Sequence, residues 1–400
     1  MVDPAHTSEP ISTDWASVYL IVSAGIVAAL QVGKAVIAAP MLQTDLGIGL
    51  AGIGWLTGVF AVLGLIGGIP TGALVGSLGS RRILSLGLLT TTIGAAYGAV
   101  ATPLPALLLS RVVEGAGFLL ITVAAPSILA QVTKRSDRDF AFALWSCFIP
   151  AGMAIAMLAG PLFDSWRTVW WTSCGIALVV WLLVPVVIPL TGERQAWSWL
   201  NLSQHAIDVF KAREPVVLAA MFALYSLMFF ALFSFLPVLL MERMDVTHRS
   251  AGLLSALATA ANILGNLAAG VLLSRGVKRS ALLVGASLTM GITSLGIFLP
   301  VLPDTATFIL CVVFSAVGGL IPATVLSAAP IAAPVAGLVP VVLGLIIQGN
   351  NLGQIIGPIA IGSAIQAYGW NSAAFLVACA ALTAATVAMT LGRTPRSASL

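Results

Sequence analysis

Three ionisable side chains stand inside long apolar segments, where their types could support ion-coupled chemistry. They are Lys34, Arg111 and Glu114, and the other charged residues fall outside these segments or near their ends. Arg111 and Glu114 are three positions apart, so they share a face of any helix that holds them. Lys34 and Arg111 would each lie roughly 9–10 Å below the outer boundary of the membrane, with Glu114 one turn deeper. The cluster would carry a net charge of about +1 with Glu114 ionised, which favours an anionic ligand.

These residue types assign a role to each member of the cluster. The planar guanidinium of Arg111 suits a carboxylate, and Lys34 supplies a mobile point charge. Glu114 is the expected proton-coupling group, because burial favours the neutral acid whereas arginine favours the carboxylate. Two structural alternatives remain open. Lys34 is near enough to the end of its segment to reach lipid headgroups, and Arg111 with Glu114 is possible as a purely structural ion pair.

Uncharged polar residues extend the candidate substrate site. Glutamine and asparagine side chains in an apolar segment need partners on a neighbouring helix or in a hydrated cavity. The expected substrate contacts beyond Lys34 and Arg111 are Gln31, Gln348, Asn351, Gln354 and, with less support, Tyr225. Asn262 and Asn266, spaced four apart, are expected instead to hydrogen-bond between helices.

The composition identifies the elements that must position these side chains. Apolar residues make up 59% of the 400 residues and charged residues 8%, against about 25% charged in a soluble globular protein. A crossing of the bilayer needs about 20 apolar residues. The sequence predicts an all-α membrane protein with twelve spans, near 15–39, 50–76, 83–101, 104–131, 139–163, 167–190, 215–240, 249–273, 280–301, 304–330, 336–365 and 370–392.

The basic residues predict the orientation of these spans. In this topology nearly all loop lysines and arginines fall on one side, and only Arg167, Arg243 and Arg249 fall on the other. The positive-inside rule therefore places both termini in the cytoplasm of a cell whose inner, or plasma, membrane holds the protein. The net charge of +4 reports this topology and gives no indication of nucleic-acid binding. Membrane lipid is the expected surrounding partner.

An internal repeat divides the chain into two halves. A shift of 197 positions takes Gly79 to Gly276, Pro103 to Pro300 and the Gly160-Pro161 pair to Gly357-Pro358. We expect two six-helix bundles in the same orientation, related by a pseudo-twofold axis along the membrane normal. The predicted units are a tail at 1–14, a first bundle at 15–190, an amphipathic interdomain loop at 191–214, a second bundle at 215–392 and a tail at 393–400.

Several motifs resemble those of the major facilitator superfamily over essentially the whole chain. Gly72-Ala-Leu-Val-Gly76-Ser-Leu-Gly79-Ser-Arg81-Arg82 is similar to the loop signature G-x-L-x-D-R-x-G-x-R-R/K, although Gly76 and Ser77 replace its Asp and Arg. Arg111-Val-Val-Glu114-Gly115-Ala-Gly117 looks like the R-x-x-x-G-x-G element. Ala156-Met-Leu-Ala-Gly160-Pro161 resembles the G-x-x-x-G-P element of proton-coupled exporters. The resemblance implies the superfamily's fold and a facing arrangement of spans one and four around a central cavity.

The same resemblance assigns a gating role to a set of loop and helix-end residues. Their proposed work is to bend helices or to close the loops as the halves rock, and packing alone is the alternative for the Gly-Pro pairs. The set is Gly72, Gly79, Arg81, Arg82, Gly160, Pro161, Gly276, Lys278, Arg279, Gly357 and Pro358.

These observations favour a secondary active transporter over other classes of protein. The leading hypothesis is alternating-access transport of a small organic or inorganic anion with proton coupling, by a monomer that needs no cofactor or metal. The alternative is a proton-coupled drug or metabolite efflux antiporter of the same fold. A non-transporting membrane sensor is a remote third. We expect no enzymatic activity, because the three histidines, His6, His205 and His248, lie outside the spans and no nucleotide-binding loop is present.

Overall fold

The computed structural model describes residues 12–134, 137, 141–142, 144–145, 147–189, 207–334 and 338–391. Within these residues the chain is helical and contains no strand. The first half comprises α1 (Trp15–Ile37), α2 (Ala39–Leu46), α3 (Leu50–Gly58), the 3-10 turn η1 (Val59–Ala61), α4 (Val62–Leu78), α5 (Ser80–Val100), α6 (Leu104–Val132), α8 (Phe148–Ala159), the 3-10 turn η2 (Gly160–Leu162) and α9 (Trp166–Val187).

The second half repeats this pattern of long apolar helices. It comprises α11 (Arg213–Phe233), α12 (Leu236–Met244), α13 (His248–Ser274), α14 (Arg279–Phe298), α15 (Asp304–Gly318), α16 (Leu320–Ala332), α17 (Val339–Tyr368) and α18 (Asn371–Met389). Short polar side chains begin several of these helices. Asp14, Ser165 and Thr247 each accept a hydrogen bond from a backbone N–H in the first turn, at α1, α9 and α13, which satisfies a donor that the helix leaves free.

The predicted spans correspond to these helices. Ten helical stretches among the described residues are long and apolar enough to cross a bilayer. The shorter α8 with η2 stands at the predicted fifth span and the 30-residue α17 at the predicted eleventh. The chain is therefore a multi-pass membrane protein. The predicted segment 191–214 lies mostly outside the described residues.

Several predicted spans are interrupted rather than continuous. The second contains the 3-10 turn η1, the fifth ends in η2, the seventh breaks between α11 and α12, and the tenth breaks at Gly319. Pro237 explains the position of α12, because proline lacks the N–H that would continue α11 and is tolerated in a first helical turn. Glycine lowers helix propensity at Gly319. The break at η1 matters most, since it lies beside the charged cluster.

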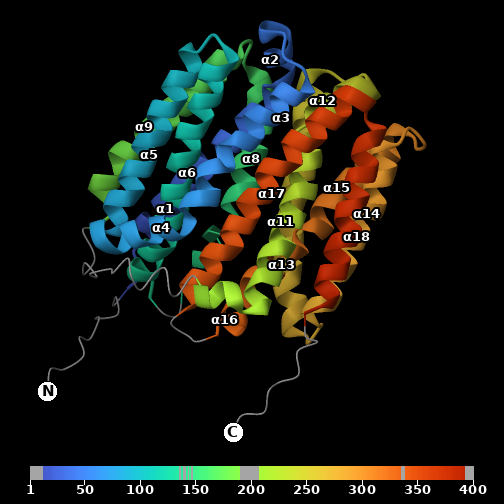
Figure 1. Ribbon diagram of the computed structural model, residues 1–400. Helices are drawn as coiled ribbons and strands as arrows, with labels where there is room; N and C mark the ends of the chain where they lie inside the picture. The colour runs from blue at the N-terminus through green and yellow to red at the C-terminus, as the bar shows by residue number, and fades with distance from the viewer. Residues whose placement is uncertain are drawn as a thin grey trace, which may run out of the picture.

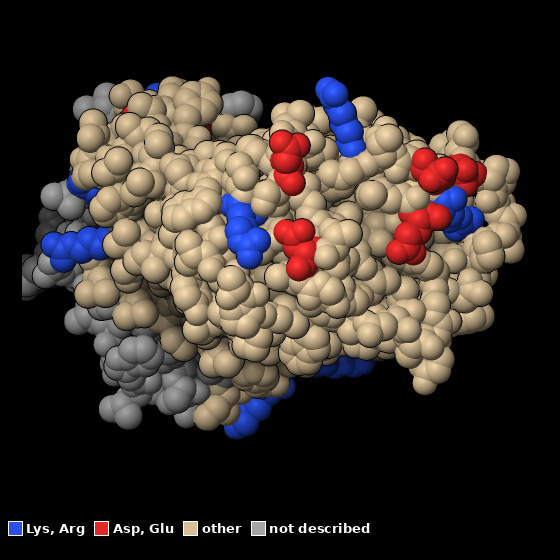
Figure 2. All heavy atoms as spheres, turned by 90° about the horizontal axis from the view of Figure 1, so that it is seen from above, with Lys and Arg blue, Asp and Glu red and all other residues tan. Residues whose placement is uncertain are grey.

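The helices form two bundles that pack side by side (Figure 1). The first contains α1 to α9 and the second α11 to α18, and α17 lies against α3 and α4 while α13 lies against α8. The start of α1 and the end of α18 lie at one end of the molecule, called here the termini end. The turns at α2 and α12 lie at the opposite, far end (Figure 1). Figure 2 looks onto the far end and shows a few acidic and basic side chains, some of them gathered at one side, on an otherwise uncharged face.

The turn that ends α4 and the turn that ends α13 confirm part of the repeat. Gly79 and Gly276 both have positive φ, at 90° and 84°, a conformation that glycine adopts without steric cost. The constant shift of 197 positions is wrong further along. Pro103 caps α6, but the residue that caps α15 is Pro303 and not Pro300. The second half has longer loops on either side of α14, so sequence matching alone misassigns this pair.

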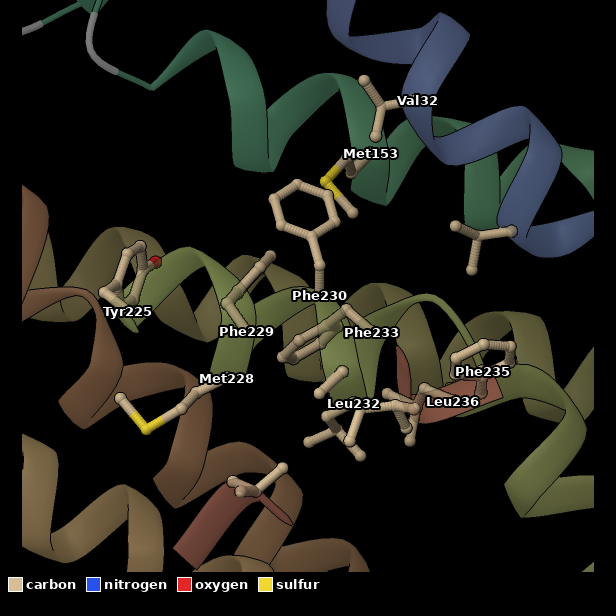
Figure 3. Packing of buried hydrophobic residues seen from close by; sticks show 14 of the residues in the cluster. Val32, Met153, Tyr225, Met228, Phe229, Phe230, Leu232, Phe233, Phe235 and Leu236 are labelled. Atoms are coloured by element: carbon tan, nitrogen blue, oxygen red, sulfur yellow. The ribbon is translucent and has the colours of Figure 1, made fainter. Parts of the chain in front are cut away.

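An aromatic side chain of α11 contributes to the contact between the bundles. Figure 3 shows Phe230 pointing from α11 toward Met153 of α8 and Val32 of α1, all three buried. Phe229 and Phe233 stack with ring centroids 4.3 Å apart on the same helix. Large buried rings contribute substantial apolar area, so this contact helps to hold the bundles in the arrangement seen here.

Candidate functional site

The structure brings the three predicted ionisable residues into contact. Lys34 Nζ of α1 donates a hydrogen bond to Glu114 Oε1 of α6 at 2.7 Å, and Arg111 Nη1 donates to Glu114 Oε2 one turn away. All three side chains have an exposed fraction of 0%. A carboxylate thus lies between two cations, and we call this group the ionic trio. With ordinary protonation states its net charge is about +1.

Neighbouring polar atoms and rings enclose the ionic trio. Lys34 Nζ also donates to Ser173 Oγ of α9 at 3.0 Å and lies 4.6 Å from the centroid of the Trp170 ring. Arg111 Nε donates to the carbonyl oxygen of Leu56 at 3.1 Å. Arg111 Nη2 is buried and has no hydrogen-bond partner within the described part of the chain. The trio is therefore a buried network in which the donor Arg111 Nη2 stays unsatisfied.

Lys34 does not snorkel to the membrane surface, because its ammonium group is bound inside the first bundle. The structure also corrects the expected position of the cluster. The three charged residues are absent from the lining of the cavity between the bundles. They lie behind Phe60 of η1, whose ring centroid is 4.6 Å from Arg111 Cζ and which does line that cavity. The facing of α1 and α6 is as expected, but one aromatic ring separates the charges from the cavity.

The cavity between the bundles has a volume of about 190 Å³ and an aromatic wall. Its described lining contains no charged residue and includes Phe60, Phe118, Trp145, Phe148 and Phe222, with Thr122, Asn350 and Asn351 as polar groups. The rings of Trp145 and Phe148 stack with centroids 4.4 Å apart. The volume falls below the roughly 300–1,000 Å³ typical of drug-sized sites. The cavity therefore suits a small solute with an apolar body.

The uncharged polar candidates divide between the cavity and the bundle interiors. Asn351 lines the cavity and donates to the carbonyl oxygen of Ile347 at 2.9 Å. Gln348 lies against Gly68 of α4, and Gln354 is buried, but neither is part of the cavity lining. Gln31 is buried and donates to the carbonyl oxygen of Val27 within its own helix at 3.2 Å. Of the glutamines, none contacts the cavity in this state.

Tyr225 belongs to a hydrogen-bonded contact between helices of the second bundle. Its hydroxyl oxygen accepts from Asn262 Nδ2 of α13 at 3.1 Å, and the same Nδ2 donates to the carbonyl oxygen of Ser315 of α15 at 3.0 Å. Asn266 in turn donates to Asn262 Oδ1 at 2.9 Å. The expectation that Asn262 links helices is confirmed by these contacts, and Tyr225 is not a cavity residue here.

The loop residues assigned to gating occupy the termini end. Gly72 lies in α4, and Gly79 and Gly276 form the turns described above. Arg81 donates to the carbonyl oxygen of Pro185 at 2.9 Å, which ties α5 to α9, whereas Arg82 is exposed. Lys278 is the N-cap residue of α14 and Arg279 is the first residue of that helix.

The two Gly-Pro pairs contribute to paired contacts between the bundles near the far end. A Cβ added to Gly252 of α13 would meet Pro161 Cδ at 3.2 Å, and one added to Gly54 of α3 would overlap the carbonyl group of Pro358. Gly160 lies against Ile37, and Gly357 against the backbone of Leu227. Each proline thus faces a glycine of the opposite bundle. These glycines permit close approach of the backbones.

Sequence reasoning missed the phenylalanines of the aromatic wall. Phe60, Phe118, Phe148 and Phe222 give no signal that separates them from the many other apolar residues of the spans. The described residues also contain no cluster of histidine, cysteine and acidic side chains suited to a metal ion.

Comparison with known proteins places this geometry in a family. The sequence pattern of the Major Facilitator Superfamily matches residues 21–339. A puromycin resistance protein of Streptomyces alboniger is 27% identical over 192 residues, covering 45% of this chain and 37% of its own length. A galactose-proton symporter of Escherichia coli K12 is 23% identical over 174 residues, covering 44% of this chain and 36% of its own. The matches thus span about a third of the length of these relatives.

A solved structure has the same fold. It is the inward-facing and occupied form of a bacterial homologue of the human lysosomal transporter Spinster, with a TM-score of 0.75 at 20% identity over 94% of this chain and 96% of that one. The match to the family pattern covers well over half of the sequence, and the fold agrees with it. The chain therefore belongs to the Major Facilitator Superfamily of membrane transporters.

Proposed function

We propose that the protein is a proton-coupled secondary transporter that carries a small organic anion with an apolar, often aromatic, body by alternating access. One observation carries the proposal: a buried cluster of net charge about +1 lies one aromatic ring away from the cavity between the bundles. The cavity wall suits the apolar body of the solute. Arg111 Nη2, the unsatisfied donor, suits its anionic group.

Glu114 is the proposed proton site because it connects both cations. In the present state its two carboxylate oxygens each accept from one cation. A substrate carboxylate that binds Arg111 competes with Glu114 for the guanidinium, so Glu114 then takes up a proton more readily. If one monoanion and one proton enter together, the net charge of the occupied site stays at about +1. Transport of a monoanion is then electroneutral symport.

The loops and helix ends supply the remaining parts of the proposal. In the proposed mechanism the bundles stay in contact at the far end through Gly54, Gly252 and the two Gly-Pro pairs. The loops at the termini end open and close through the turns at Gly79 and Gly276 and through Gly72, Arg81, Arg82, Lys278 and Arg279. The distribution of basic residues supports cytoplasmic termini in an inner membrane. The proposed working unit is a monomer with the substrate site between its own bundles.

Three probes of similar size but different charge test the substrate class: benzoate, benzyl alcohol and benzylamine. Purified protein should be stabilised against heat by benzoate and more strongly at mildly acidic pH, because binding stabilises the folded state. Arg111→Gln should abolish the preference for benzoate over benzyl alcohol. Equal binding of all three probes would contradict the anionic assignment. A benzoate preference that survives in Arg111→Gln would contradict the assignment of Arg111 as the group that binds the anion.

A second candidate function is proton-coupled antiport of an uncharged or cationic aromatic compound. The observation that favours it is the absence of any charged residue from the described cavity lining. In that case Phe60 stays in place and Arg111 never contacts substrate. Stabilisation by benzylamine or benzyl alcohol but not by benzoate, unchanged in Arg111→Gln, would select this candidate.

A further inference from the structure

Phe60 is the side chain shared by the cavity and the ionic trio. Its ring is buried, with an exposed fraction of 2%. One neighbour is the Arg111 guanidinium, with Cζ 4.6 Å from the ring centroid, and another is the Phe118 ring, 5.3 Å away at an interplanar angle of 65°. Phe60 and Phe118 both line the cavity, and the Phe60 ring also lies against the Arg111 guanidinium. The Phe60 ring therefore lies between the cavity and this guanidinium.

The backbone that carries Phe60 is an interrupted helix. The 3-10 turn η1 stands between α3 and α4, so the helix departs from regular α geometry at this point. Arg111 Nε donates to the carbonyl oxygen of Leu56, near the end of α3. A Cβ on Gly115 would overlap the carbonyl oxygen of Phe60. Arg111 and Gly115, four residues apart on α6, thus contact the backbone at the α3–α4 break on the side that faces the trio.

Helix α17 of the opposite bundle contacts the same α3–α4 break from the other side. A Cβ on Gly58 would meet the carbonyl oxygen of Ile355 of α17 at 2.8 Å, and one on Gly64 would meet Asn351 Nδ2 at 2.7 Å. The break therefore contacts α6 within its own bundle and α17 across the interface. Any rocking of the second bundle against the first displaces α17 relative to α6, and the segment between them must follow.

From this placement we propose that the Phe60 ring is a gate between the cavity and the ionic trio, opened by movement of the α3–α4 break. The proposal rests on the function proposed above and adds the element that couples substrate to proton. With the gate closed, as here, the trio is buried and internally paired. With the gate open, Arg111 binds the anionic group of the substrate and Glu114 receives a proton from the hydrated cavity.

The groups that face Glu114 determine how this gate acts on its protonation. They are Lys34 from α1, Arg111 from its own helix and the Cys174 thiol from α9, which interacts electrostatically with both Lys34 and Glu114. On the α5 side a Cβ on Gly94 would meet Glu114 Cγ at 2.8 Å, so that face is closed by backbone. Phe60 covers the side of the trio that faces the cavity.

Proton permeability without substrate tests the gate. A minor state is typically populated at about 0.1–10%, so a permanently open gate should raise proton flux roughly tenfold or more. Proteoliposomes containing Phe60→Ala should dissipate a pH gradient faster by that factor than wild type, with no benzoate present. Phe375→Ala removes an exposed ring of α18 that lies outside the cavity lining; it is the control and should stay as tight as wild type.

A second variant covers the case in which Phe60→Ala fails to fold. Phe60→Leu keeps an apolar side chain at the break but removes the ring that covers the guanidinium, and it should also leak. Proton-tight liposomes for a folded Phe60 variant, or an equal leak in Phe375→Ala, would overturn the gate. Because no substrate is used, this result is separate from the proposed function, which fails instead if wild type shows no benzoate-dependent proton uptake.

Discussion

Replacing Glu114 by glutamine should destabilise the protein much more than replacing Lys34 by methionine. Glutamine keeps the volume of Glu114 but leaves Lys34 and Arg111 as two cations with exposed fractions of 0% and no compensating charge. Methionine at position 34 instead leaves Arg111 paired with Glu114, which is neutral overall, and its chain fills the space of the lysine stem. The two variants therefore change the net charge of the trio in opposite directions.

The expected magnitudes follow from the burial of the trio. Removing one partner of a buried ion pair costs about 3–5 kcal/mol, and this applies to Glu114→Gln. Lys34→Met loses its hydrogen bonds with Glu114 at 2.7 Å and with Ser173 at 3.0 Å, together worth about 2 kcal/mol net, while it removes an excess buried charge. The difference in free energy of unfolding between the variants should thus be about 1–3 kcal/mol.

Titration of purified protein with dodecyl sulfate in mixed micelles, followed by tryptophan fluorescence, measures this difference. The double variant with both substitutions leaves only Arg111 charged, so it should recover part of the stability that Glu114→Gln loses. Equal losses in the two single variants would refute the reasoning. So would a double variant that is no more stable than Glu114→Gln alone.

Four further outcomes are expected from the same contacts. Asn262→Ala removes hydrogen bonds of 3.1 Å to Tyr225 and 3.0 Å to Ser315 and should lower unfolding stability by about 1–3 kcal/mol in the same titration; an unchanged midpoint would contradict a linking role. Gly252→Ala should separate the bundles at the far end, because its Cβ would meet the Met157 carbonyl oxygen at 2.6 Å. Gln366 joins α17 to α3 by a hydrogen bond, so Gly252→Ala should speed maleimide labelling of a cysteine placed there by Gln366→Cys. Gly175→Ala, with open space around its Cβ, should have no such effect. Arg111→Lys cannot make both the Leu56 hydrogen bond and the Glu114 contact in this geometry, so benzoate counterflow should fall about tenfold, equivalent to about 1.4 kcal/mol; wild-type counterflow would show that the guanidinium fork is not needed. Benzoate uptake should respond to a pH gradient and not to a potassium diffusion potential, and a potential-driven flux would rule out one-to-one electroneutral symport.

The helices and the ionic trio could be predicted from the sequence for one physical reason. Hydrocarbon excludes charge, so twenty-residue apolar runs mark the spans and a rare charge within them stands out. Lys34 and Glu114 are 80 positions apart, yet each is rare enough in its surroundings that mutual pairing was a reasonable expectation. The cost of leaving either charge unpaired in the membrane explains why they meet.

The cavity could not be predicted in the same way. Hydropathy does not report which face of an apolar helix meets lipid, a neighbouring helix or a solute, so Phe60 and Phe222 look like any other apolar residue. The break at η1 has no proline to mark it, since Pro70 lies well inside α4. The position of Arg111 behind Phe60, rather than in the cavity wall, depends on that break and was therefore missed.

Proton movement during benzoate transport tests the central claim that the ionic trio couples the two fluxes. Proteoliposomes that hold a trapped pH indicator should show proton uptake when benzoate is added to wild-type protein. Glu114→Gln should still exchange labelled benzoate across the membrane but should move no protons with it. Proton uptake at the wild-type rate in Glu114→Gln would contradict the account, because the trio would then have no part in coupling.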